Sequence, residues 1–324
     1  MKPKPRKPML PILLIGLLAG CGKGPQVLGP SGPSATDQDQ AEISSTMGTV
    51  PELVEDGAFE REEALASGLS APESAGPADG TSAAIEPLGF WRRITSVERR
   101  FEFEFRDEDP AGRPQTAIVT IHKQLRGTFN ILVEGPKSST EDVSRLVIHK
   151  RLADHSVRRI LLKRVPALER QVEPEFNRPR WRVAATSGVQ VTSLPRDLKD
   201  HAEIVSLRVK TADLDVVITD PLAFIRLRQI LQFQHEEKVE LTVTTKRADD
   251  VVVLLRAGGR LRFTNNGDNT YTGVWTPAAL RGVAHFGVNA LSHDTLYDDE
   301  APYNSQAWIL PYVIRPCELA EYMP

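Results

Sequence analysis

The feature of this 324-residue sequence that most constrains its fold is a strict alternation of apolar and polar residues. In RRFEFEFRDE, three phenylalanines fall on one side of the chain and the intervening glutamates fall on the other. The stretches EIVSLRVKT and VELTVTTK repeat the pattern with valine and leucine. This period of two is typical of antiparallel strands with one buried and one solvated face. Two helix candidates, DVSRLVIHKRL and LAFIRLRQILQ, can also form strands, so the sequence predicts a mainly β body.

The C-terminal part of the body, residues 198–316, is predicted to be a β-sandwich. Short alternating stretches are separated by turn signals about every ten residues, such as Ala-Gly-Gly and Asn-Gly-Asp-Asn. Two later stretches read Tyr271-Thr272-Gly273-Val274-Trp275 and Gly282-Val283-Ala284-His285-Phe286. From about residue 220 to 315, this order of features resembles the immunoglobulin-like modules of bacterial envelope proteins. The resemblance implies an immunoglobulin-like fold, here without the Cys…Trp…Cys core. Residues 317–324 would form a short tail.

The first part of the body, residues 87–197, is predicted to be a separate β-rich domain. Its alternating stretches include FWRRITSVERRFEFEF, TAIVTIHKQL and RWRVAATSGVQVTS, which together indicate a meander of strands. A second sandwich, a small barrel and a curved sheet all fit this pattern, and the residues do not choose among them.

Residues 21–86 have the composition of a disordered acidic tether. From residue 22 to 86 the chain has twelve acidic and two basic side chains, and Phe59 is the only aromatic residue. Low hydrophobicity with high net charge buries too little apolar surface to offset the entropy of an ordered chain. A short helix can be drawn at PELVEDGAFEREEALASG, but the low-complexity flanks argue against a stable one.

The first twenty residues are predicted to be a secretory signal peptide. A basic start, MKPKPRK, is followed by an apolar run that is far shorter than the roughly 20 residues of a membrane-spanning helix. The run ends in Leu18-Ala19-Gly20-Cys21, which resembles the bacterial lipobox. This resemblance implies cleavage before Cys21 and attachment of a diacylglyceryl group and an N-acyl chain, often palmitate, to that residue. In enteric bacteria, an aspartate directly after the lipidated cysteine keeps a lipoprotein in the inner membrane. Gly22 and Lys23 stand here instead, and by this analogy we expect the protein at the outer membrane.

Positive charge is concentrated in the meander region, where residues 88–197 contain 21 basic and 14 acidic side chains. Much of it comes in pairs of neighbouring basic residues, the basic doublets. They are Arg92-Arg93, Arg99-Arg100, Lys150-Arg151, Arg158-Arg159 and Lys163-Arg164. They could simply keep a sheet surface soluble. They could also form a face for an anionic partner, such as an envelope polymer, lipid headgroups or the acidic tail of this protein itself. The proposed face comprises Arg99, Arg100, Arg158, Arg159, Lys163 and Arg164. Because neighbours in a strand face opposite ways, we expect only one member of each doublet on a given face.

Sites for metals or catalysis are weakly indicated. Asp298, Asp299 and Glu300 could supply oxygen ligands for calcium, but the spacing of a calcium loop is missing, and an acidic loop is the simpler interpretation. Thr186-Ser187-Gly188 lacks the first glycine of a nucleophile elbow. No cofactor motif occurs. With Cys21 lipidated, Cys317 has no partner for a disulfide within the chain.

The sequence therefore predicts a membrane-anchored envelope lipoprotein with a non-catalytic binding or structural role. Its expected partners are the membrane, through the lipid on Cys21, and an envelope protein or anionic envelope polymer. The export signal argues against nucleic acid as a partner. The alternative is a hydrolase of envelope glycan with a cleft between the two β domains, since paired carboxylates need only be close in space.

Overall fold

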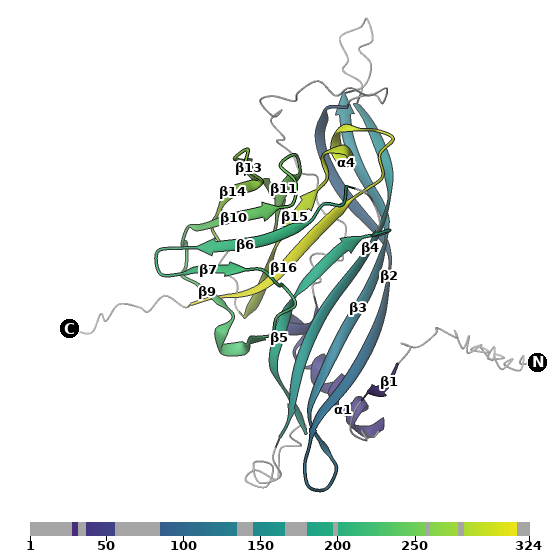
Figure 1. Ribbon diagram of the computed structural model, residues 1–324, viewed down its shortest axis with the longest axis vertical. Coiled ribbons are helices and arrows are strands. Elements are labelled where there is room, and N and C mark those ends of the chain that lie inside the picture. Colours follow the sequence, from purple (N-terminus) through teal and green to yellow (C-terminus); the bar gives the residue numbers. More distant parts are fainter. Residues whose placement is uncertain are drawn as a thin grey trace, which may run out of the picture.

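The computed structural model describes residues 28–31, 37–55, 85–134, 145–165, 180–196, 200–256, 259–277 and 282–315. This part of the chain is mostly β-strand, arranged in two largely antiparallel sheets, which confirms the predicted fold class. Figure 1 shows long strands running the length of the molecule with a compact group of shorter strands beside them.

The long strands form an up-and-down meander. They are β2 (Pro87–Glu108), β3 (Pro114–Glu134), β4 (Arg145–Arg164) and β5 (Trp181–Ser193). A strand of 22 residues, such as β2, spans about 75 Å when extended. The described part of the helix candidate DVSRLVIHKRL belongs to β4, so this stretch forms a strand and not a helix. Of the three arrangements left open for this region, the structure has the curved sheet.

The shorter strands complete a β-sandwich. One sheet has the order β13-β14-β10-β6-β7, and the relevant part of the other has the order β12-β11-β15-β16. Apart from β7, which adds one strand at the edge next to β6, this order equals D-E-B-A and C′-C-F-G of the immunoglobulin fold. The strands are β6 (Ile204–Lys210), β7 (Asp215–Ile218), β10 (Val239–Thr245), β11 (Val251–Arg256), β12 (Gly259–Arg262), β13 (Thr264–Asn265), β14 (Thr270–Trp275), β15 (Val283–Leu291) and β16 (Ser305–Ile314).

The core of the sandwich contains the residues that carried the resemblance. Tyr271, Trp275 and Phe286 are buried between the two sheets. Trp275 lies 5.1 Å from Phe286 and 5.2 Å from Tyr312 between ring centroids. The candidate helix LAFIRLRQILQ instead forms β8 (Ile225–Arg226), a 3₁₀ turn at Leu227–Gln229 and β9 (Leu231–Phe233).

The meander and the sandwich share one sheet. Strand β5 pairs with β16, the last strand of the sandwich, so an 11-stranded sheet runs across the boundary that we predicted between residues 197 and 198. A buried cluster also joins the two parts, with Phe90 and Phe129 from the meander packed among Val253 and Ile309 from the sandwich. The two predicted domains are therefore one packed unit in the described part of the chain.

Three short elements precede the meander and rest on its lower half in Figure 1. They are β1 (Leu28–Ser31), which pairs in parallel with β2, and the helices α1 (Asp37–Gly48) and α2 (Pro51–Val54). Ile43 and Met47, one turn apart on α1, are buried in a cluster with residues of β2, β3, β4 and β5. Their composition predicts that residues 37–55 belong to the disordered tether, whereas the structure packs them on the sheet. The reason is that their few apolar residues fall on one helix face, which average composition does not reveal.

None of the helices in the described ranges is long and apolar enough to cross a membrane.

Candidate functional site: the basic doublets of the meander

The meander has an inner face, on which Phe103, Val119 and Ile160 are buried, and an outer face opposite to it. Strand alternation divides each basic doublet between these faces, as expected. The inner members are Arg92, Arg99, Lys150, Arg158 and Arg164, and the outer members are Arg93, Arg100, Arg151, Arg159 and Lys163. The six residues proposed as one basic face therefore do not form one face.

A β-bulge in β2 makes this division consistent along the strand. The pairing register of β2 with β3 shifts between Ile94 and Ser96, which leaves Thr95 as the extra residue. Without the bulge, Arg93 and Arg99 would share a face, because they are six residues apart. Gly127 of β3 lies at the same point, where a Cβ would come within 1.9 Å of the Arg93 carbonyl oxygen. The close approach of the two backbones at the bulge therefore requires glycine at 127.

At the lower end of the inner face, Arg164 holds helix α1. Its Nη2 lies 2.6 Å from Oδ1 of Asp39, and the two side chains are only 10 % and 8 % exposed. The same carboxylate oxygen accepts a hydrogen bond from Nε1 of Trp181 at 3.2 Å. The guanidinium of Arg164 also lies over the Trp181 ring, 4.7 Å from its centroid. A buried, charge-assisted contact of this kind fixes the position of the helix on the sheet.

Further up the inner face, Arg158 holds the end of α2. Arg158 is 1 % exposed, and its Nη1 donates to the carbonyl oxygen of Leu53 at 2.7 Å. That carbonyl lies in the last turn of the helix, where the backbone oxygens have no helical partner. Nη2 of Arg158 lies 3.2 Å from Nε2 of His285, so the His285 side chain points toward the meander. The more exposed Arg99 pairs with Glu55 at 3.4 Å.

At the upper end, Arg92 takes part in a buried polar cluster. Its Nη1 lies 3.4 Å from Oδ2 of Asp154, and Tyr303 donates to the same oxygen at 3.3 Å. Burial raises the pKa of Asp154 to about 6, although Arg92 and the Tyr303 hydroxyl oppose the shift. This cluster connects β2 and β4 to the segment before β16, so it joins the meander to the sandwich.

Lys150 holds the loop that contains the metal candidates. Its Nζ donates to the backbone carbonyl oxygens of Asp294 and Asp298, and burial lowers the pKa of this lysine to about 8, although nearby carboxylates oppose the shift. The loop begins with the short helix α4 (His293–Tyr297), whose N-cap Ser292 accepts from the backbone of Thr295.

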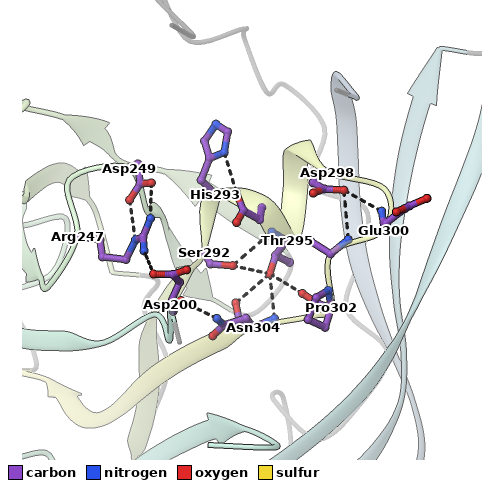
Figure 2. A network of polar contacts seen from close by, with 12 residues as sticks. Asp200, Arg247, Asp249, Ser292, His293, Thr295, Asp298, Glu300, Pro302 and Asn304 are labelled. Atoms are coloured by element: carbon purple, nitrogen blue, oxygen red, sulfur yellow. Dashed lines mark hydrogen bonds and ion pairs between the residues drawn. The ribbon is translucent and has the colours of Figure 1, made fainter. Parts of the chain in front are cut away.

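Figure 2 shows how the same loop uses its polar groups. Oδ1 of Asp298 accepts the backbone N–H groups of Glu300 at 2.9 Å and Ala301 at 3.2 Å. Thr295 Oγ1 donates to the Asn304 carbonyl oxygen at 3.1 Å, which closes the loop onto the start of β16. Asp299 and Glu300 are exposed. Within the described ranges, no group of three or more His, Cys, Asp or Glu side chains is arranged to hold a metal ion. Asp298 has a structural role in the loop.

Two histidines on the outer face form a hydrogen-bonded chain. Arg196 Nη2 lies 2.8 Å from Nδ1 of His155, and His155 Nε2 lies 3.2 Å from Nδ1 of His122. Arginine can only donate, so Nδ1 of His155 is unprotonated and its Nε2 carries the hydrogen. His122 Nε2 then points its hydrogen toward Glu102, at 3.4 Å. Burial, with Arg196 and His122 nearby, lowers the pKa of His155.

The other candidates from the sequence are placed as follows. Ser187 is fully buried, and its hydroxyl donates to the Gly188 carbonyl oxygen at 2.6 Å. Cys21 and Cys317 lie outside the described residues. Sequence reasoning did not identify Asp39 and Glu55 as partners of the basic doublets. The signal that could have found Asp39 is its spacing from Ile43 and Met47, which puts the three side chains along one helix face.

A cavity of about 280 Å³ lies beside the sandwich, between the start of β7 and the segment 228–237. Polar contacts cross or border it, including Gln234 to Asp213 at 3.2 Å and Arg315 to Gln232 at 2.8 Å. It lies away from the basic doublets, on the sandwich side of the molecule.

Comparison of the chain with protein-family models, with curated proteins and with solved structures gives no match.

Proposed function

We propose that this chain is a lipid-anchored protein of the bacterial envelope with a non-catalytic binding or structural role. The lipobox-like sequence ending in Cys21 supports the anchor, and Gly22 and Lys23 support a location at the outer membrane. The observation that carries the proposal is the attachment of the N-terminal elements to the meander. Because these elements follow Cys21 closely in the sequence and pack on the meander, a lipid on Cys21 would hold the sheet itself near the membrane.

The position of β1 supports a short connection between the lipid and the body. Leu28 pairs with Glu102 of β2, and Cys21 is only seven positions before Leu28 in the sequence. Seven extended residues reach at most about 25 Å. The body would therefore be held close to the membrane by the β2 edge, and not at the end of a tether running to residue 86.

The two sets of basic residues suggest a division of tasks. The inner set, through Arg99, Arg158 and Arg164, contacts the protein's own N-terminal segment at Glu55, Leu53 and Asp39. The acidic N-terminal segment of the protein itself is therefore one anionic partner of these arginines, through Asp39 and Glu55. In the outer set, Arg159 lies over the Phe224 ring, and the other members are exposed in the described structure and could meet a partner outside the chain.

The alternative of a hydrolase required a cleft between the two predicted domains. Where they meet, Phe90, Phe129, Val253 and Ile309 fill a common hydrophobic cluster. The cavity beside the sandwich is not at this junction. We therefore favour the binding or structural role.

The anchor is tested by the variant Cys21→Ser. We expect this variant to lose incorporation of labelled palmitate and to leave the detergent phase, because the lipid is attached to the thiol. Normal partitioning of the variant into detergent would contradict the anchor. The non-catalytic role is tested by incubating purified envelope glycan with the full protein. Release of soluble reducing ends would contradict it.

A further inference from the structure

Three arginines from three neighbouring strands meet on the outer face of the meander. Arg93 of β2 and Arg151 of β4 both pair with Thr128 of β3. Adjacent strands are about 4.8 Å apart, so the backbones of these two arginines lie about 10 Å apart. Arg126 is two residues from Thr128 on the same face of the central strand. We call Arg93, Arg126 and Arg151 the outer arginine patch.

The patch is exposed and its guanidinium groups have no hydrogen bond or ion pair with a described residue. The surrounding outer face adds Arg100 and His149, and among the described residues of β2, β3 and β4 the only carboxylate between the rows of Arg100 and Trp91 is that of Glu98. Trp91, half-buried, lies one row above the patch, opposite Asn130. The surface therefore combines an excess of positive charge with an aromatic side chain.

We propose that the outer arginine patch docks this protein onto the phosphate headgroups of the membrane surface. Guanidinium groups bind phosphate with two parallel hydrogen bonds, and several of them on a flat sheet suit an extended anionic surface. Tryptophan is enriched at the interface between a bilayer and water. This inference rests on the proposed lipid anchor, because the anchor is what brings the membrane close to this face.

The reach of the chain makes that contact possible. A chain of seven residue steps, from Cys21 to Leu28, reaches at most about 25 Å, so Cys21 lies within that distance of the point where β1 meets Glu102. Along the same strand, Glu102 and Arg93 are nine residues apart, or about 30 Å. The lipid and the patch can therefore reach the same membrane plane, with the outer face lying along it. Tethering in this way raises the effective concentration of the surface for the patch.

The test uses the mature chain from residue 21 without lipid, which carries Cys21→Ser and is made without the signal peptide. Its binding to vesicles of equal parts phosphatidylglycerol and phosphatidylcholine is measured at several salt concentrations. Each basic side chain near an anionic surface contributes about a factor of five in affinity, so the triple variant Arg93→Gln, Arg126→Gln, Arg151→Gln should bind roughly 100-fold more weakly. Binding of the parent should fall steeply as salt rises.

A matched control removes the same charge elsewhere. Arg226, Arg228 and Lys238 are exposed near the sandwich, so replacing these three by glutamine should change vesicle binding less than about threefold. Equal loss in the two triple variants, or no binding to anionic vesicles at low salt, would overturn the proposal. Binding to dextran sulfate without binding to vesicles would also overturn it, because the patch would then recognise a polyanionic chain. Failure of the lipid anchor is seen separately, in the detergent partitioning of the Cys21→Ser precursor.

Discussion

Replacing Asp39 by asparagine should release helix α1 from the meander. In the native protein the Asp39 carboxylate accepts hydrogen bonds from both Arg164 and Trp181, and its side chain is only 8 % exposed. Breaking a buried ion pair costs about 3–5 kcal/mol because one charge stays buried without its partner. Arg164 keeps its bond to the Pro114 carbonyl oxygen and its contact with the Trp181 ring, so we reduce this to about 2 kcal/mol.

The assay is hydrogen exchange of the amides of α1, which reports the equilibrium between docked and released helix. A loss of about 2 kcal/mol corresponds to a fall of about 30-fold in the protection of these amides. Asp37→Asn is the control, since Asp37 is also in the first turn of α1 but is exposed. It has the same effect on the helix dipole without touching Arg164. If both variants lose protection equally, or if neither does, the ion pair with Arg164 does not hold the helix.

Two further predictions concern the sheet itself. Gly127→Ala should lower the free energy of unfolding by about 2 kcal/mol, because the added Cβ would meet the backbone oxygen of Arg93 at the bulge. The control Gly48→Ala adds a Cβ that meets nothing within 4 Å, so it should change the free energy of unfolding little. Equal denaturant midpoints for the two variants would refute the close approach. His155 has a lowered pKa in the folded protein, so the unfolded chain binds more protons below pH 6.5 and this group makes stability fall as pH drops from 7 toward 5. In denaturant unfolding at both pH values, His155→Gln should therefore lose less stability than the native protein, and an unchanged loss would count against the histidine chain.

Much of the fold follows from local alternation in the sequence. The period of two in β2, β6 and β10 predicts strands with one buried face, and the structure buries Phe103, Leu207 and Leu241 accordingly. Alternation also predicts that the members of each basic doublet face opposite ways. Strand and turn signals of the same local kind predict a sandwich, whereas its immunoglobulin-like strand order was implied only by the resemblance of residues 220–315.

Two features of the candidate site could not be predicted because they depend on partners distant in sequence. The bulge at Thr95, which puts Arg93 on the outer face, needs Gly127 on the neighbouring strand. The docking of α1 depends on a contact between Asp39 and Arg164, which are 125 residues apart. A helix of 12 residues is marginal by itself in water, so its stability comes from this packing and not from its own sequence. Average composition therefore placed it in the tether.

The central claim is that each basic doublet has an inner member that supports the structure and an outer member that is available to a partner. The most direct test compares the free energies of unfolding of Arg158→Gln and Arg159→Gln by denaturant titration. Arg158 is buried and bonded to the Leu53 carbonyl oxygen, so its loss should cost about 3 kcal/mol. Arg159 lies over the Phe224 ring at the surface, so its loss should cost about 1 kcal/mol or less. Equal costs for the two variants, or a larger cost for Arg159, would contradict the division of the doublets between the two faces.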